Sequence, residues 1–181
     1  DAGTWSSGGS VNTARASGGG AGTAQTEALL FGGTSGSNVA NTEQYNGTSW
    51  TETTDLNSAR SLTGGTGTYT AALSAGGSSP GQYVEEWDGS SWTETANLNT
   101  ARRGNNGLFG TQTAAILTGG YLPSGPGTAA TETWNGTAWT EVNDLNTARW
   151  ALTTGGTTTA GIAAAGEVSP KAETESWDGS S

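Results

Sequence analysis

The chain has 181 residues, of which 31% are hydrophobic and 31 are glycine, and its formal net charge is −10. This excess of acidic residues argues against nucleic acid as a partner, because nucleic-acid binders need basic groups that displace counterions from phosphates. No apolar run approaches the roughly 20 residues of a membrane-spanning helix, so membrane insertion is not expected.

The regular tryptophans favour a folded all-β chain over a disordered one. Low hydrophobicity with a high net charge is also typical of disorder, but disordered segments are poor in aromatic residues. Here only 12% of residues are charged, and eight tryptophans recur along the chain. Small residues with periodic aromatics indicate many short strands joined by turns.

A first repeated motif reads aromatic-(Asp/Asn)-Gly-x-x-Trp. It begins at Tyr45, Trp87 and Trp134, and a fourth copy begins at Trp177. Asn-Gly or Asp-Gly between two extended runs predicts a β-hairpin, because both residues tolerate a positive φ. A tryptophan then leads, ten residues later, to an arginine that closes an Asn-(Ser/Thr)-Ala-Arg element. The four pairs are Trp5 with Arg15, Trp50 with Arg60, Trp92 with Arg102, and Trp139 with Arg149.

The segment after each arginine predicts two further strands. A run of small residues such as Gly18–Gly20 favours an inner strand close to the axis of a tight ring. An apolar strand follows, predicted at Glu27–Phe31, Thr70–Ala75, Thr113–Thr118 and Gly161–Ala165, and it ends at a Gly-Gly doublet or at Ala165-Gly166. After a variable loop, a glutamate stands two residues before the next aromatic residue: Glu43, Glu85, Glu132 and Glu175. Each unit of about 45 residues thus holds four strands, the size of one propeller blade.

A glycine doublet, then an aromatic residue, then a tryptophan resembles the kelch motif, and the resemblance covers the whole chain. The five-residue gap from aromatic to tryptophan is shorter than usual, and the fourth doublet reads Ala165-Gly166. The composition is similar to that of the Thr/Gly-rich kelch-like arrays of phage virion proteins, especially those of marine phages.

This resemblance implies an all-β, four-bladed kelch-like β-propeller that is a single domain over residues 1–181. The expected blades are residues 14–58, 59–100, 101–147, and 148–181 together with 1–13. The N-terminal strand Thr4–Ser7 is expected to complete the last blade, with Trp5 as the partner that Trp177 needs; this closure would remove exposed sheet edges. An alternative is that two chains build an eight-bladed ring, so a homo-oligomer is compatible with the sequence. The start at Asp1 and the absence of Met predict a processed product or a piece of a longer repeat.

The repeated charges are expected to be structural. Each of Arg15, Arg60, Arg102 and Arg149 is predicted to pair with one of Glu43, Glu85, Glu132 and Glu175, or with backbone carbonyls between blades. The planar guanidinium group suits this role because it donates two hydrogen bonds to one carboxylate. A catalytic ring of carboxylates is the alternative, but an active site rarely needs the same pair four times.

The sequence predicts no enzyme, no cofactor and no metal site. The chain contains neither His nor Cys, so it offers no Ser-His-Asp or Cys-His nucleophile and no usual zinc site. Calcium bound by Asp55 or Asp144 is a minor alternative, since calcium takes oxygen ligands. Both aspartates are more simply explained as turn residues.

Ligand binding is expected in the loops that vary between repeats. These are Thr34–Asn41, Ser78–Gln82, Tyr121–Ala130 and Glu167–Ala172. The longest carries Tyr121 and Leu122, and in kelch propellers this loop shares a face with the loop that Arg103 and Trp150 flank. We therefore predict a binding face formed by Tyr121, Leu122, Arg103 and Trp150, with core packing as the alternative role of Trp150.

The predicted function is a non-catalytic interaction module displayed on a virion or cell surface, extracellular or virion-associated, that contacts a glycan or a protein surface. The alternative is a purely structural spacer or a self-assembling propeller unit without a small ligand.

Overall fold

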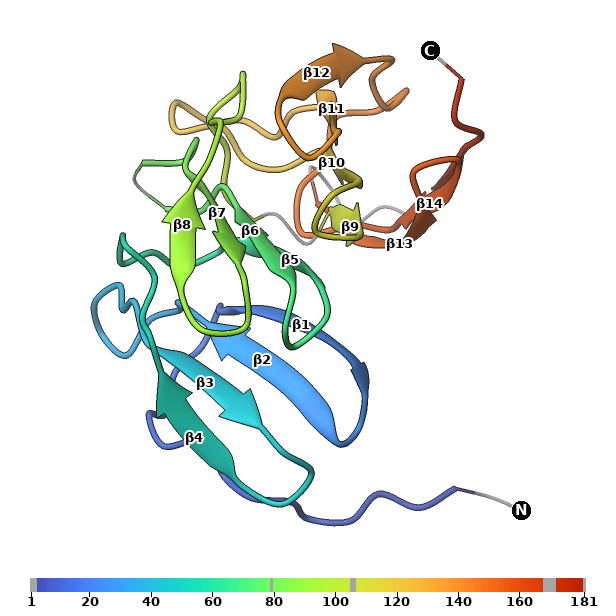
Figure 1. The fold of residues 1–181 in the computed structure, drawn as a ribbon. Helices are drawn as coiled ribbons and strands as arrows, with labels where there is room; N and C mark the ends of the chain where they lie inside the picture. Colours follow the sequence, from blue (N-terminus) through green and yellow to red (C-terminus); the bar gives the residue numbers. More distant parts are fainter. Residues whose placement is uncertain (1–2, 79, 105–106, 168–171, 181) are drawn as a thin grey trace.

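The computed structural model describes residues 3–78, 80–104, 107–167 and 172–180, which form four antiparallel sheets. In each sheet the strands follow one another in chain order, each pairing with the next. Among the residues that the structure describes, no helix is long and apolar enough to cross a membrane. The fold is a four-bladed, all-β propeller arrangement, as predicted, and each sheet is one blade (Figure 1).

The strand bounds of the four blades are as follows. Blade 1 contains β1 (Gly19–Ala24), β2 (Glu27–Phe31), β3 (Thr42–Tyr45) and β4 (Trp50–Thr53). Blade 2 contains β5 (Gly64–Gly67), β6 (Ala72–Ala75), β7 (Val84–Trp87) and β8 (Trp92–Glu94). Blade 3 contains β9 (Leu108–Gly110), β10 (Ala115–Thr118), β11 (Thr131–Trp134) and β12 (Trp139–Val142). Blade 4 contains β13 (Thr153–Thr157), β14 (Ala160–Ala164) and β15 (Thr174–Trp177).

The Asn-Gly hairpin forms where it was predicted, with a different turn geometry. Between β3 and β4 only Gly47 takes a positive φ, of 91°. A positive φ at one residue alone differs from the type I′ turn, in which both central residues have a positive φ. Asn46 caps the turn instead: its Oδ1 accepts hydrogen bonds from the backbone N–H groups of Thr48 and Ser49, at 3.0 and 2.9 Å. The asparagine is therefore selected by its side-chain oxygen.

The glycine doublet turns the chain and joins neighbouring blades. Gly32 and Gly33 have φ values of 61° and 111°, a region that favours glycine. The N–H of Gly33 donates to the carbonyl of Arg60, which leads into blade 2, at 2.8 Å. In the fourth doublet Ala165 adopts the same left-handed conformation, with φ 59°.

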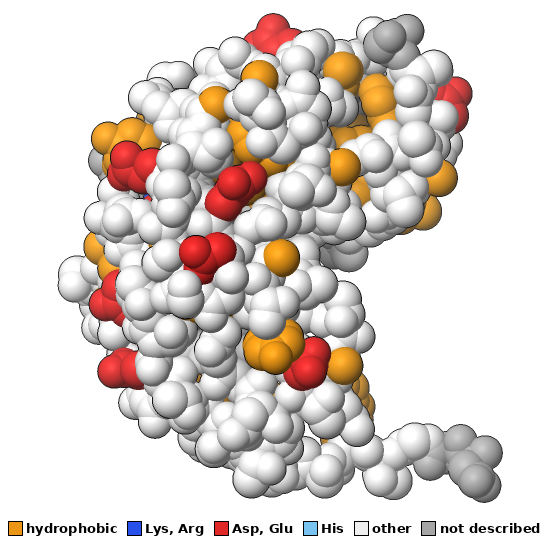
Figure 2. Space-filling model, viewed as in Figure 1, with side chains coloured by type: hydrophobic (Ala, Val, Ile, Leu, Met, Phe, Trp, Pro, Cys, Tyr) orange, Lys and Arg blue, Asp and Glu red, His pale blue; other side chains and the backbone are white. Residues whose placement is uncertain are grey.

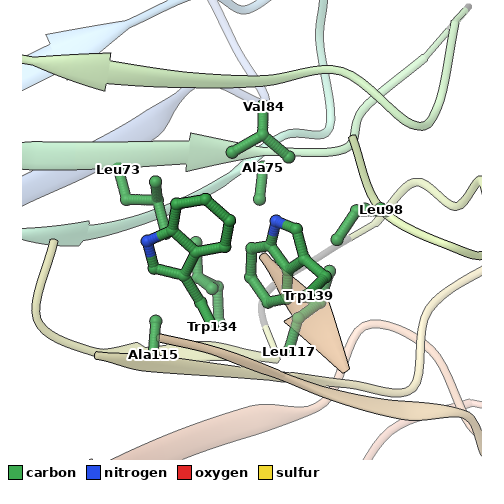
Figure 3. Close-up of a cluster of buried hydrophobic side chains, with 9 residues drawn as sticks. Leu73, Ala75, Val84, Leu98, Ala115, Leu117, Trp134 and Trp139 are labelled. Carbon is green, nitrogen blue, oxygen red and sulfur yellow. The ribbon is translucent and has the colours of Figure 1, made fainter. Parts of the chain in front are cut away.

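The buried hydrophobic clusters of the described residues lie between blades, one at the seam between blades 1 and 2 and one at the seam between blades 2 and 3. At the seam between blades 2 and 3, Trp134 and Trp139 of blade 3 pack against Leu73 and Ala75 of blade 2 (Figure 3). The two indole rings lie 5.3 Å apart, and both are at most 6% exposed. Blade 3 therefore buries its aromatic pair against the preceding blade.

The seam between blades 1 and 2 has the same plan. Trp87 and Trp92 of blade 2 pack against Leu29 and Phe31 of blade 1, and the rings of Phe31 and Trp92 meet edge to face at 4.8 Å. The indole Nε1 of Trp92 donates to Thr42 Oγ1 at 2.9 Å.

The four blades form an open arc rather than a closed ring. The inner strands β1, β5, β9 and β13 contact one another in that order. On the open side, blade 4 and blade 1 face a wide gap, seen in the ribbon and the space-filling view (Figures 1 and 2). The inner strands β1 and β5 do approach closely, since a Cβ on Gly65 would lie 2.4 Å from the carbonyl oxygen of Gly20.

The predicted closure by the N-terminal strand is wrong. Blade 4 is a three-stranded sheet in which β15 pairs only with β14, and Trp5 is fully exposed. Residues 4–9 lie beside the β3–β4 hairpin of blade 1, where they line a cavity with Tyr45. The physical reason is the open gap between blades 4 and 1 (Figures 1 and 2). Asn12 donates two hydrogen bonds to Glu43 on β3, and Arg15 pairs with the same carboxylate. This anchor holds the N-terminal segment to blade 1, across the opening from blade 4.

Candidate functional site

Each repeat arginine pairs with the repeat glutamate of its own blade. The pairs are Arg15–Glu43, Arg60–Glu85 at 2.7 Å, Arg102–Glu132, and Arg149–Glu175 at 2.5 Å. The connector before each arginine adds an asparagine to the same carboxylate. In blade 2, the backbone N–H and Nδ2 of Asn57 donate to Glu85 Oε2 at 2.7 and 2.8 Å. Each of these carboxylates, on the third strand of its blade, therefore binds the connector and holds it against that strand.

The electrostatics of these pairs fit a structural role. Burial lowers the pKa of Arg60, while the charge of Glu85 opposes that shift. For Glu43, burial raises the pKa, but hydrogen bonds from Asn12, Arg15 and Thr13 outweigh it and the net pKa is lowered. The paired charges stabilise each other in the interior.

The two aspartates weighed for calcium serve as acceptors for backbone groups. Asp55 Oδ1 accepts from the N–H of Thr42, and Asp144 Oδ1 accepts from the N–H of Thr131, both at 3.2 Å. Within the described ranges, no group of three or more acidic side chains is placed to hold a metal ion.

The variable loops and the residues after the repeat arginines meet on one face of the propeller. Arg103 and Tyr121 form a two-way backbone bridge: Arg103 N–H donates to Tyr121 O at 3.0 Å, and Tyr121 N–H donates to Arg103 O at 2.7 Å. Trp150 forms the same bridge with Glu167, at 3.2 and 2.8 Å. The position after each repeat arginine thus pairs with the start of the variable loop. Residues 79 and 168–171, in two of these loops, lie outside the described residues.

Three of the predicted binding residues form what we call the aromatic cluster: Arg103, Tyr121 and Trp150. The rings of Tyr121 and Trp150 meet edge to face, with centroids 5.5 Å apart and an interplanar angle of 74°. The guanidinium carbon of Arg103 lies 5.1 Å from the centroid of the Tyr121 ring, a cation–π distance. The three side chains, with Leu62 and Gly104, line a shallow cavity of about 260 Å³.

The fourth predicted residue, Leu122, does not line this cavity, whereas Leu62 was missed. Leu122 lies in the turn of its loop, where its N–H donates to Pro126 O at 3.2 Å. Leu62 is 39% exposed and stands two residues after Arg60, as Gly104 stands two residues after Arg102. The N–H of Gly104 donates to Leu62 O at 2.9 Å. Aligning the repeats at their arginines would have brought Leu62 to this face.

Comparison with known proteins adds no family to this picture. No protein-family model matches the chain, and no curated protein matches it either. The kelch resemblance therefore stays a prediction that rests on the repeated motif.

Proposed function

We propose that this chain is a non-catalytic, kelch-like interaction module that binds a glycan through the aromatic cluster. The observation that supports the proposal is the convergence of Arg103, Tyr121 and Trp150 around one cavity. The cluster comes from loops that differ between repeats, while the repeated residues build the scaffold. Specificity on a repeated fold is expected in such non-repeated loop positions.

The chemistry of the cluster suits a sugar ring. A pyranose has an apolar face of C–H groups and a rim of hydroxyls. Tyr121 and Trp150 offer large apolar ring faces that each carry a polar group. Arg103 offers several N–H donors in a fixed plane. An apolar lining with few directed polar groups is the usual composition of a small-ligand site.

The charge of Arg103 is available to a ligand. The four ion pairs of the described residues use Arg15, Arg60, Arg102 and Arg149, and Arg103 takes part in none of them. In a chain with a net charge of −10, this guanidinium is a local site for sugar hydroxyls or for the carboxylate of an acidic sugar.

The size of the cavity favours a glycan over a protein surface. About 260 Å³ lies below the roughly 300–1,000 Å³ of pockets that enclose drug-sized ligands. That volume matches one sugar unit at the end of a chain more closely than a protein segment. Display on a virion or cell surface is supported by the Thr/Gly-rich composition alone.

Glycan-array binding by the purified chain tests the proposal. The parent chain should bind saturably, and the Tyr121→Ala, Trp150→Ala double variant should bind at least about tenfold more weakly, because stacking area is lost. Arg103→Ala should weaken acidic glycans more than neutral ones.

Tyr69→Ala is the matched control, since Tyr69 lies in the β5–β6 turn at the opposite end of blade 2. It should bind as the parent does. No binding by the parent, or equal binding by the double variant, would overturn the glycan site and favour a structural or protein-contacting role.

A further inference from the structure

The open side of blade 4 carries an apolar residue that the other blades bury. In each second strand, the residue just before the one opposite the repeat glutamate faces the next blade. Leu29, Leu73 and Ile116 at this position are 2%, 0% and 1% exposed, whereas Ile162 is 50% exposed. Tryptophan pairs of the following blade cover Leu29 and Leu73. Ile162 therefore exposes an apolar side chain of the kind that is buried in the other three blades.

A cavity of about 210 Å³ lies where blade 4 has no fourth strand. It is lined by Ile116 and Thr131 of blade 3 and by Ile162 and Trp177 of blade 4, among others. At the two preceding seams the fourth-strand tryptophans Trp92 and Trp139 fill this place. The cavity is thus shaped for a tryptophan from a strand that pairs with β15.

The N-terminal segment has the sequence of such a fourth strand. Trp5 precedes Arg15 by ten residues, the spacing of the other three tryptophan–arginine pairs, and Val11 stands where they carry leucine. Trp5 is fully exposed in the single chain. Meanwhile Asn12 and Arg15 already hold blade 1 as the other connectors hold their blades. Residues 4–8 are therefore placed to extend into a blade that adjoins blade 1.

Backbone hydrogen bonds indicate the same match between the two open ends of the arc. At each internal seam the second doublet glycine donates to the carbonyl of the next repeat arginine: Gly33 to Arg60, Gly77 to Arg102, and Gly120 to Arg149, at 2.8, 3.0 and 2.9 Å. In this series Gly166 at the open end of blade 4 corresponds to the donor, and Arg15 at the open end of blade 1 to the acceptor. The two open ends thus offer the two halves of one more seam.

We propose that two copies of this chain close into an eight-bladed ring, in which residues 4–8 of each copy add a fourth strand to β15 of the other. Trp5 fills the cavity beside Trp177, and Ile162 packs against Tyr45 and Trp50 of the second copy. The contact is head to tail, and such contacts give rings when the rotation closes. Closed propellers have typically 4–8 blades, and two copies of this four-bladed arc bring eight blades.

The assembly can be tested apart from the glycan proposal, because the side chains of Arg103, Tyr121 and Trp150 line a different cavity from the one beside Trp177. Light scattering after size-exclusion chromatography should give twice the 18.0 kDa of one chain. Trp5→Ala should weaken the dimer by roughly 100-fold or more, since a buried tryptophan is lost. Ile162→Asp should dissociate it too, and Trp150→Ala should leave it intact. Trp5 is exposed in the single chain, so its replacement does not unfold that chain.

Cysteine cross-linking identifies the strand and the partner, and the native chain has no cysteine to interfere. By the register of β7 with β8, Ser6 should lie opposite Ser176, at the roughly 5.5 Å between Cα atoms that a disulfide spans. Oxidising a mixture of the single variants Ser6→Cys and Ser176→Cys should join two chains. A mixture of Ser6→Cys with Ser90→Cys, on an exposed hairpin, should not. A monomer that never cross-links between chains would overturn the proposal. So would a Ser6→Cys, Ser176→Cys double variant that cross-links only within one chain.

Discussion

The seam between blades 2 and 3 and the open side of blade 4 have the same strand pattern and very different surroundings. Leu73 at the seam is completely buried, whereas the corresponding Ile162 is half exposed. The same holds for the ion pairs: the side chain of Glu132 is 0% exposed and that of Glu175 is 14% exposed. Blade 4 forms its strands and its Arg149–Glu175 pair all the same.

This difference shows which part of the stability each blade supplies itself. Strand pairing and the hold of the connector on the repeat glutamate are local, because both form even in blade 4 at the open end. Burial of the second strand is supplied by the next blade. Repeat proteins in general combine intrinsic repeat stability with nearest-neighbour interfaces. Blade 4 of the open arc follows the same rule: it forms its own sheet, but no further blade covers its second strand.

The largest expected effect comes from breaking equivalent ion pairs at the two places. Glu85→Gln leaves Arg60 charged in a site where both side chains are 0% exposed, so it should cost about 3–5 kcal/mol of unfolding free energy. Glu175→Gln should cost about 1.5–3 kcal/mol, the range for a hydrogen bond to a charged group, because the Glu175 side chain is 14% exposed. Urea unfolding midpoints of the two variants at neutral pH measure the difference. Equal losses would mean that the ion pair itself, and not its burial between blades, determines how much stability the glutamate contributes.

A smaller effect concerns the indole N–H groups at the seams between blades 1 and 2 and between blades 2 and 3. Trp92 Nε1 donates to Thr42 Oγ1, whereas Trp139 Nε1 is buried without a partner. The register explains this: Thr42 stands opposite Phe31, and the corresponding position opposite Ala75 is Val84. Thr42→Val should cost about 1–3 kcal/mol, since it leaves a buried donor unsatisfied.

The reverse exchange, Val84→Thr, supplies the missing acceptor. The hydrogen bond gained, about 1 kcal/mol, should offset the cost of burying a hydroxyl, so the net change in unfolding free energy should be close to zero. The same urea titration compares both variants. If Val84→Thr destabilised the chain as much as Thr42→Val, the indole acceptor would not be the cause.

The repeated motif made the blade predictable but not the ring. The strand Glu27–Phe31 was predicted with the bounds it has, and the arginine–glutamate pairs follow from residues that recur at fixed spacing. These features depend on contacts within about 45 residues. Ring closure depends on the angle between blades, and no motif residue encodes that angle. The glycines of β1 and β5 do permit close approach, but β9 carries Leu108 and Phe109 on the same inner layer.

The candidate site was predictable only in part, for a related reason. Tyr121 and Trp150 stand out because they break the repeat, and a break in a repeat is visible in the sequence. Leu62 is as close to the cluster but is an ordinary residue in a connector. Its side chain reaches the cavity because the chain turns there through a φ of 57°. The same position is left-handed in the other repeats, at Ser17, Gly104 and Ala151, so an alignment at the arginines, with Gly104 as its only glycine, was the available signal.

The smallest expected effect lies in the hairpin turns, where blade 2 differs from blades 1 and 3 by a charge. Hydrogen bonds from the backbone N–H of Ser91 and from the hydroxyl and N–H of Ser90 lower the pKa of Asp88 to about 2, from an ordinary value of 3.8. Asn46 and Asn135 accept the same two backbone hydrogen bonds without a charge. Because the folded pKa lies below the unfolded one, the stabilisation by Asp88 is complete above pH 3.8 and is lost as the pH falls toward about 2.

Asp88→Asn should therefore fold with an unchanged hairpin and lose this part of the acid sensitivity. Between pH 3.8 and about 2, the urea midpoint of the parent should fall more steeply than that of the variant. Other carboxylates, including Glu43, titrate in both proteins, so their contributions cancel in the difference. A gap between the two midpoints that stayed constant over this range would show that Asp88 gains nothing from its charge, and that the turn in blade 2 is stabilised by the same uncharged geometry as its two neighbours.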